Sequence, residues 1–315
     1  MRQFPVRRRV HAIALATATA AALLASGGSP ASADPTTTTA ASRAALERPT
    51  SNVAVPAPAP GAKTTATSSP SFAGTGVRTP SRGAAVDEGA PGVNSIIGAD
   101  ERYKINATTS YPYRAIALIT FNGGRCTGWF YGPDVVGTAG HCLHSGGSGG
   151  AWSTNVVVYP GYTGTSAPYG SCTAKSLHSV SGWTSSANHE FDYGTIKLNC
   201  TLGNTVGWLG YFWTADPGLN GLPTRVCGYP GDKPLEQWCG DADNGAQATV
   251  VSVTAEKVYY RNDTVGGNSG AAVHYNRAGC GECSMAYHGY GGNPNSGKRI
   301  TQATFSNMQY WTSLP

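Results

Sequence analysis

From residue 95 onward, the chain alternates between short runs of β-branched and aliphatic residues and clusters of Gly, Asn, Asp and Pro. Such runs predict short β-strands that are separated by turns. The clearest of them are residues 115–121, 155–159, 194–198 and 248–253. A helical period is predicted at the end, where Thr301 could cap a helix that continues to about Trp311. Many short strands with one terminal helix predict an all-β fold, either barrels or a sandwich.

The N-terminal third has a different composition. Residues 1–33 combine a basic start at residues 7–9, an apolar run too short to span a bilayer and the small residues Ala-Ser-Ala at 31–33, which is typical of a secretory signal peptide. Residues 34–94 are mostly Ala, Thr, Pro, Ser and Gly, with Phe72 as their only aromatic residue. Such a segment buries too little apolar surface to offset its ordering entropy. We therefore expect a secreted, extracellular protein with a largely disordered pro-segment at 34–94.

Formal charge argues against two classes of partner. The whole chain carries 22 basic and 17 acidic residues, of which residues 1–94 hold 9 and 4, so that 13 of each sign remain. The part after residue 94 is therefore about neutral. A neutral surface favours neither nucleic acid nor an anionic membrane as a partner, and we expect neither.

Three local motifs carry a histidine, an aspartate and a serine in that order. They are Thr-Ala-Gly-His-Cys around His141, Phe-Asp-Tyr-Gly around Asp192, and Gly-Gly-Asn-Ser-Gly around Ser269. A serine hydroxyl is a poor nucleophile until an imidazole accepts its proton, and a carboxylate on the far side of the ring fixes the tautomer. We predict that these three residues form a catalytic triad. The glycines predict a tight turn in which the N–H groups of Gly267 and Ser269 form an oxyanion hole.

Other candidates have weaker signals. Four further histidines lie in no comparable motif, and we expect most of them to be solvated or at the core edge: His144, His178, His189 and His274. Cys142 beside His141 could indicate a thiol protease, but adjacent strand residues point to opposite faces, which favours a disulfide instead. The sequence shows no compelling metal motif and no phosphate-binding loop, and we expect no metal and no cofactor.

From about Ile96 to its end, the chain resembles the bacterial secreted glutamyl endopeptidases, which are relatives of chymotrypsin. The resemblance rests on the three triad motifs and on residues 97–102, 111–116, 126–129, 228–233 and 299–301. It implies a secreted zymogen, a chymotrypsin-like double β-barrel and cleavage of polypeptides after acidic residues. A division in the Gly- and Asn-rich region predicts an N-terminal barrel at 95–205 with His141 and Asp192, and a C-terminal barrel at 206–315 with Ser269 and the helix.

Primary specificity has two opposed indications. The resemblance implies that His288 and Thr264 bind the substrate carboxylate, and a buried carboxylate does need such donors. Asp263, however, stands six residues before Ser269, where trypsin-like enzymes carry the aspartate that binds Lys or Arg. We favour cleavage after Glu or Asp. The alternatives are Lys/Arg specificity through Asp263 and a protease-like binding module without activity.

The resemblance also bears on activation. Trypsin-like zymogens pair their new terminal amine with an aspartate just before the nucleophile, but this chain has Asn268 there. The resemblance instead suggests that an activating protease cleaves near Asn94–Ser95 and leaves the new amine close to the specificity pocket. We expect a monomer.

All eight cysteines follow residue 95, and an even number in an exported protein suggests four disulfides. The resemblance places Cys126–Cys142 beside the catalytic histidine. Cys280 and Cys283 are spaced for a small disulfide loop. Eight cysteines allow 105 connectivities, so Cys172–Cys200 and Cys227–Cys239 follow only by elimination.

Overall fold

Strands dominate the computed structural model, which describes residues 40–57, 71–72, 95–215, 218–241 and 248–315. The predicted signal peptide lies outside these ranges. Within them, no helix has the length and apolar character needed to cross a membrane.

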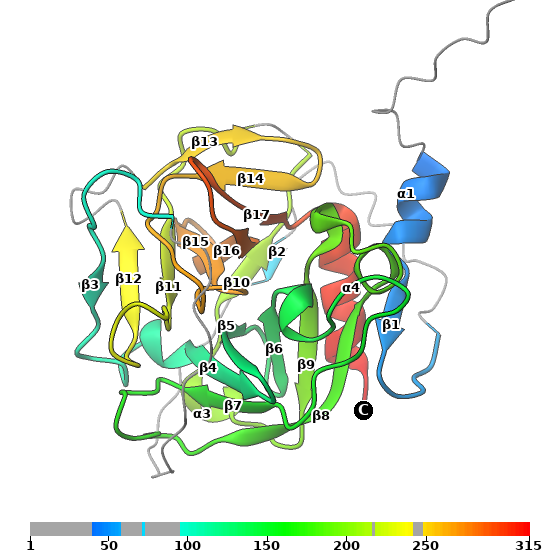
Figure 1. The fold of residues 1–315 in the computed structure, drawn as a ribbon, viewed down its shortest axis with the longest axis horizontal. Helices are drawn as coiled ribbons and strands as arrows, with labels where there is room; N and C mark the ends of the chain where they lie inside the picture. The colour runs from blue at the N-terminus through cyan, green and yellow to red at the C-terminus, as the bar shows by residue number, and fades with distance from the viewer. Residues whose placement is uncertain (1–39, 58–70, 73–94, 216–217, 242–247) are drawn as a thin grey trace, which may run out of the picture. The chain divides into compact units, whose positions relative to one another are not determined.

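The first sheet closes on itself. Its order is β1-β8-β7-β4-β5-β6-β9, and a further pairing of β8 with β9 joins the six strands β4–β9 into a barrel (Figure 1). The strands are β1 Pro49–Ser51, β4 Ile116–Phe121, β5 Gly124–Phe130, β6 Val135–Thr138, β7 Val157–Pro160, β8 Cys172–Val180 and β9 Gly194–Leu198. Trp129, Phe130 and Ile196 are fully buried in its core.

The second sheet is curled but open. Its order is β13-β14-β17-β16-β15-β11-β12-β3, and β10 adds to β16 in parallel and to β2. The strands are β2 Ser71–Phe72, β3 Tyr103–Lys104, β10 Gly210–Phe212, β11 Arg225–Gly228, β12 Trp238–Asp241, β13 Val250–Val253, β14 Lys257–Tyr260, β15 Ala272–Arg277, β16 Gly281–Tyr290 and β17 Asn295–Arg299. The two sheets confirm the predicted double-barrel, all-β fold. The predicted domain boundary at 205/206 falls between β9 and β10, although β3 belongs to the second sheet.

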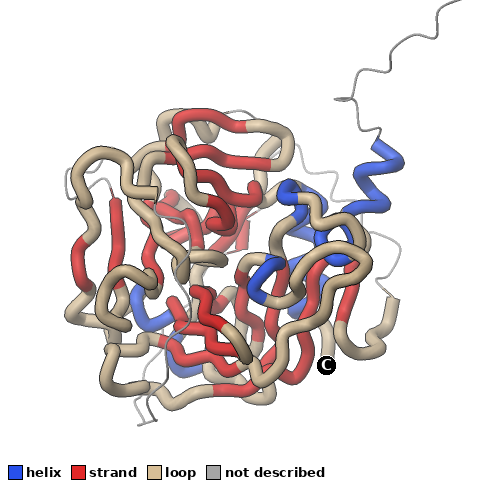
Figure 2. Tube along the Cα trace, viewed as in Figure 1, coloured by secondary structure: helices blue, strands red, loops and turns tan. Residues whose placement is uncertain are grey.

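Helices are short apart from the last one (Figure 2). They are α1 Ala40–Leu46, α2 Ser181–Thr184, α3 Gly203–Val206 and α4 Gln302–Ser313, with 3-10 turns η1 Tyr113–Ala115, η2 Gly140–Cys142 and η3 His189–Phe191. The Thr301 hydroxyl accepts a hydrogen bond from the Thr304 N–H at 3.2 Å, which is the cap that the sequence predicted. The buried Trp311 brings α4 against Tyr193 at the start of β9, with ring centroids 5.7 Å apart.

Part of the N-terminal segment is structured, which corrects the expectation of a largely disordered pro-segment for residues 40–57. α1 leads into β1, which pairs antiparallel with the end of β8. Leu46 and Val55 pack against the first core. The composition argument failed here because these residues use the edge of a finished sheet and ion pairs rather than a core of their own.

Four disulfides join the cysteines in the predicted pairs, and no cysteine is free: Cys126–Cys142, Cys172–Cys200, Cys227–Cys239 and Cys280–Cys283.

Candidate active site

Two members of the predicted triad meet in the first barrel. His141 lies on η2, directly after β6, and Asp192 lies directly before β9, which pairs with β6. The His141 Nδ1 atom is 2.7 Å from Asp192 Oδ2, and the His141 backbone N–H donates to Asp192 Oδ1 at 2.7 Å. Asp192 is 1 % exposed and the His141 ring 31 %. The imidazole is thus oriented by a buried carboxylate while one side of it faces solvent.

The two groups stabilise each other's charged forms. Burial disfavours both charges, but the facing partner and the hydrogen bond between them outweigh burial. The pKa of His141 is therefore raised above its usual 6.5, and the pKa of Asp192 is lowered. Asp192 is an anion at neutral pH and is suited to stabilise an imidazolium when His141 accepts a proton.

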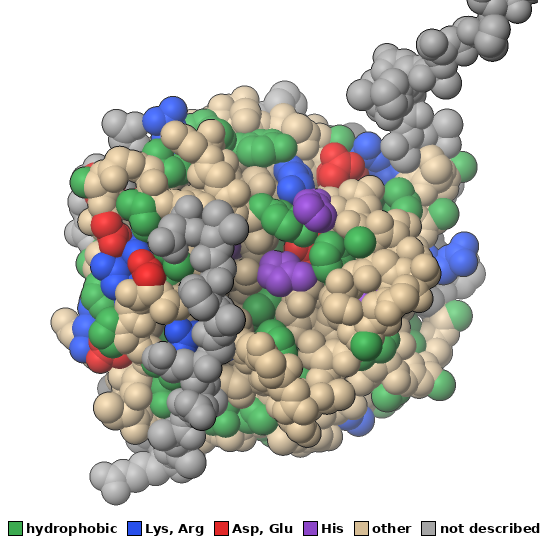
Figure 3. All heavy atoms as spheres, viewed as in Figure 1, with side chains coloured by type: hydrophobic (Ala, Val, Ile, Leu, Met, Phe, Trp, Pro, Cys, Tyr) green, Lys and Arg blue, Asp and Glu red, His purple; other side chains and the backbone are tan. Residues whose placement is uncertain are grey.

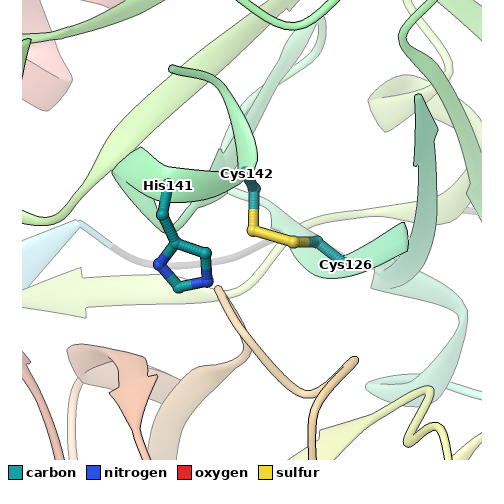
Figure 4. A group of neighbouring side chains, drawn as sticks. All are labelled: Cys126, His141 and Cys142. Atoms are coloured by element: carbon teal, nitrogen blue, oxygen red, sulfur yellow. A yellow bond between two sulfur atoms is a disulfide. The ribbon is translucent and has the colours of Figure 1, made fainter. Parts of the chain in front are cut away.

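Ser269 comes from the second sheet, between β14 and β15, and is held against the first barrel. The Thr127 N–H donates to the Ser269 carbonyl at 2.9 Å. Cys126, the neighbour of Thr127, is bonded to Cys142, the neighbour of His141 (Figure 4). The disulfide therefore links η2, which carries the imidazole, to β5, the strand whose Thr127 N–H contacts the Ser269 carbonyl. The Ser269 hydroxyl makes no hydrogen bond within the described part of the chain.

The turn before Ser269 exposes two N–H groups. Gly267 has φ +101°, and a Cβ atom there would lie 2.4 Å from the Tyr229 carbonyl oxygen, so only glycine fits. The N–H groups of Asn268 and Gly270 donate to carbonyls of the fold, whereas those of Gly267 and Ser269 have no acceptor among the described residues. These are the two donors that the sequence predicted for an oxyanion hole.

Ser269 opens onto a pocket of about 210 Å³. Its walls are Thr264, Val265, Gly266, Ser269 and residues 288–291 of and after β16. The structure therefore brings the predicted nucleophile and both predicted specificity residues, His288 and Thr264, into one cavity. Figure 3 shows histidine side chains grouped near the centre of this face of the molecule.

His288 is a neutral hydrogen-bond donor in this pocket. It is 3 % exposed, and burial, with the nearby His141, lowers its pKa to about 3 in spite of the Asp192 charge. Its Nδ1 atom lies 2.5 Å from the hydroxyl of Tyr260. Burial raises the pKa of Tyr260 well above 10, so the phenol keeps its proton and can donate a hydrogen bond to Nδ1. When it does so, the ring proton of the neutral His288 lies on Nε2.

Asp263 does not line the pocket, which argues against the trypsin-like alternative. Its Oδ1 atom accepts a hydrogen bond from the Ile97 N–H at 2.8 Å, and its Oδ2 atom accepts one from the Glu101 N–H at 2.9 Å. Both carboxylate oxygens are therefore engaged by the segment that follows residue 94. Neither is turned toward a substrate side chain.

The same segment touches the pocket wall. The Ser95 N–H donates to the Thr264 carbonyl at 3.0 Å, and the Asn295 amide donates to the Ser95 carbonyl at 3.1 Å. Asn268 accepts a bond from the Val265 N–H through its side chain at 3.2 Å. Asn268 thus stabilises its own turn, while Ser95 lies beside Thr264.

The sequence reasoning missed two site features and misjudged others. Tyr260 and Asn295 carried no motif signal, because their partners, His288 for Tyr260 and Ser95 for Asn295, lie far from them in the sequence. Three of the four rival histidines are buried rather than solvated, since aromatic or ionic neighbours accommodate them: His144, His178 and His274. His189 is exposed, and its ring stacks on Tyr290 at 4.4 Å.

One group of side chains has the spacing of a metal site. Donor atoms of Cys126, His141 and Cys142 lie within 4.8 Å of one another. Both sulfur atoms, however, belong to a disulfide, and a metal needs deprotonated thiolates. The donor set therefore does not fit a metal ion.

Cys142 lies on the 3-10 turn η2 rather than on an extended strand. The alternation of side chains along a strand, from which its disulfide was inferred, therefore does not apply at this position.

Comparisons with known proteins agree with this geometry. The family model named Trypsin matches residues 102–311. The chain is 42 % identical over 228 residues to a glutamyl endopeptidase from Bacillus licheniformis, covering 70 % of this chain and 69 % of the relative. It is 40 % identical over 227 residues to a Bacillus subtilis protein named extracellular metalloprotease, covering 70 % of each. A solved structure of a Glu endopeptidase in complex with MPD superimposes with a TM-score of 0.63 at 30 % identity, covering 69 % of this chain and 99 % of that one.

Proposed function

We propose that this chain, which belongs to the trypsin family of serine endopeptidases, cleaves polypeptides on the carboxyl side of glutamate or aspartate. The observation that carries the proposal is the neutral His288 donor in the pocket that Ser269 also lines. The glutamyl endopeptidase relative adds support.

The proposed mechanism uses the His141–Asp192 pair as its base. The Ser269 Oγ atom attacks the scissile carbonyl carbon while His141 Nε2 accepts the hydroxyl proton. The oxyanion accepts hydrogen bonds from the N–H groups of Gly267 and Ser269. His141 then donates the proton to the leaving amine, and an ester to Ser269 remains. Water activated by His141 hydrolyses this ester and restores the serine.

In the proposed binding mode, the substrate carboxylate accepts hydrogen bonds from His288 Nε2–H and from the Thr264 hydroxyl. The side-chain oxygen Oγ1 of Thr264 is buried and has no hydrogen-bond partner within the described residues. A buried hydroxyl needs such a partner. Because Asp263 is engaged by backbone N–H groups, it leaves the pocket without a carboxylate of its own.

The name of the Bacillus subtilis relative raises metal-dependent hydrolysis as a second candidate. The cysteine–histidine group described above does not fit a metal ion, because its sulfur atoms are oxidised to a disulfide. The proposed mechanism therefore uses no metal ion.

A peptide panel tests the proposed specificity. The peptides differ only in the residue before the scissile bond, which is Glu, Asp, Gln, Arg, Lys or Leu. We expect kcat/KM for Glu to exceed that for Gln by at least ~100-fold, because the buried donors are matched only by a carboxylate. EDTA should leave the rate unchanged. Cleavage after Arg or Lys and none after Glu would refute the assignment.

We further infer that the protein is secreted as a zymogen and acts as a monomer on extracellular polypeptides. The four disulfides suit an oxidising compartment. Because Asn94 is not acidic, another protease has to cut Asn94–Ser95. The new amine on Ser95 would then lie beside Thr264 at the pocket.

Blocking this cut should weaken catalysis. The precursor for this test carries a substitution at Asn94 that makes the 94–95 bond resistant to cleavage. We expect its kcat/KM on the Glu peptide to be at least ~10-fold lower than that of the cut protein. The reason is that the new ammonium group of Ser95 would contribute more than ~1 kcal/mol to binding of the buried substrate carboxylate. An engineered recognition site that leaves Ser95 as the new N-terminus should restore the rate. Full activity in the uncut precursor would contradict the inference.

A further inference from the structure

A buried lysine connects the N-terminal segment, residues 40–57, to the part of the chain that begins at Ser95, here called the catalytic unit. The Lys298 side chain on β17 is 0 % exposed. Its ammonium contacts Glu256 of the second sheet and lies 3.1 Å from Oε1 of Glu47, which follows α1. It also lies over the ring of Phe191, 4.9 Å from the centroid. A fully buried ammonium needs such partners, and one of its two carboxylates comes from the segment before the predicted cleavage point.

Charged side chains of the N-terminal segment and of the catalytic unit form one continuous series of ion pairs. Arg43 Nη1 lies 2.7 Å from Glu256 Oε1, Glu256 contacts Lys298, and Lys298 contacts Glu47. The N-terminal segment supplies Arg43 and Glu47, one charge of each sign. The catalytic unit supplies Glu256 and Lys298. The two surfaces are therefore electrostatically complementary.

The catalytic unit also binds the exposed end of α1. The last carbonyls of a helix have no partner within it. Here the Ser181 hydroxyl donates to the Ala45 carbonyl at 2.6 Å, and the Ser181 N–H donates to the Arg48 carbonyl at 2.9 Å. The Asn307 amide on α4 donates to the Glu47 carbonyl at 2.9 Å. These contacts fix the end of α1 on α2 and α4.

β1 then covers an edge that the barrel leaves open. β7 pairs with β8 only at Cys172 and Thr173, whereas β1 pairs with residues 178–180 at the other end (Figure 1). Asn52 extends the pairing, because its N–H donates to the Leu177 carbonyl at 3.1 Å and its side chain accepts from the Leu177 N–H at 2.8 Å. An uncovered strand edge is an aggregation hazard.

We propose that residues 40–57 are a resident ligand of the catalytic unit, which stays bound by strand addition and by the Glu47–Lys298 ion pair after the chain is cut before Ser95. The other oxygen of Glu47 accepts a hydrogen bond from the Tyr193 hydroxyl. Because Tyr193 follows Asp192, the bound segment supports the loop that carries the triad carboxylate. The mature protein is then a two-piece complex rather than a single fragment.

The test uses the full chain with Ser269→Ala, so that its outcome does not depend on the proposed activity. A recognition site for a sequence-specific protease is placed directly before Ser95, and the purified chain is cut. Gel filtration with mass spectrometry of the peak then shows whether residues 40–57 elute with the catalytic unit. A one-to-one complex is the expected result. Elution of the two pieces in separate peaks would overturn the proposal.

Single substitutions show which contacts hold the N-terminal segment on the catalytic unit. Glu47→Gln keeps the size of the side chain but removes its charge from Lys298, so we expect a dilution series to show at least ~10-fold weaker retention. Glu101→Gln, an exposed carboxylate outside the contact, should behave as the parent. If Glu47→Gln does not fold, the exposed Asn52→Ala gives the decision through the β8 edge alone. Retention equal to the parent in both variants would exclude the proposed contacts.

Discussion

Replacing Ser269 with alanine is expected to lower kcat for a Glu-containing peptide by about 10⁶-fold, because the nucleophile and its base act as one unit. The side chain has no hydrogen bond to lose among the described residues, so the melting temperature should stay close to that of the parent. Labelling by a fluorophosphonate, followed by mass spectrometry, should be confined to Ser269 in the parent and absent in the variant.

The control for this experiment is Ser185→Ala, which alters an exposed serine outside the site and should leave both rate and labelling intact. Labelling that persists in Ser269→Ala would assign the nucleophile elsewhere. A parent protein that neither labels nor hydrolyses any peptide after the cut at Ser95 would support the inactive binding module instead.

The second large effect is expected for His288→Phe. Phenylalanine fills a similar volume but has no donor for the substrate carboxylate, and leaving one partner of a buried charged hydrogen bond unpaired costs ~2–5 kcal/mol, or about 30- to 5000-fold in kcat/KM. Because the effect depends on the charge of the substrate side chain, kcat/KM for a matched Gln peptide should fall much less. The measurement is the ratio of kcat/KM for the Glu and Gln peptides, which should approach one.

Tyr260→Phe is the control for this experiment, because it leaves the His288 side chain in place and changes only the hydrogen bond that its Nδ1 atom makes. It removes the hydroxyl that contacts Nδ1, so the ring proton of the neutral His288 can occupy either nitrogen, and we expect a smaller fall in kcat/KM for the Glu peptide than in His288→Phe. An unchanged Glu/Gln ratio in His288→Phe, in a protein that still hydrolyses both peptides, would show that His288 does not bind the carboxylate.

Some features of the fold and of the candidate site depend on local sequence signals. The motif around His141 lies at the end of one strand and that around Asp192 at the start of its neighbour, so pairing of β6 with β9 is enough to bring the two side chains together. The Thr301 cap and its helix depend on residues three positions apart. The turn at Gly267 depends on a conformation that glycine alone adopts easily.

Features that depend on distant partners could not be predicted. The direction of Asp263 is set by N–H groups more than 160 residues earlier in the chain, so its position before Ser269 could not show which way its carboxylate points. The role of Glu47 depends on Lys298, 251 residues away. Residues 40–57 contain no aromatic side chain, and Leu46, Val53 and Val55 are their only apolar side chains larger than alanine apart from two prolines; composition could not show that a barrel edge would bind them.

Strand β17 pairs with β16, which carries His288, and it also carries Lys298, and this has a consequence for protein engineering. Gly297 lies opposite His288 in the sheet, and the next residue, Lys298, contacts Glu47. A mutant library at this strand, screened for a new cleavage preference, will therefore vary two traits at once, and some improved variants will owe their activity to tighter retention of the N-terminal piece. Supplying that piece at saturating concentration during the screen would separate the two traits.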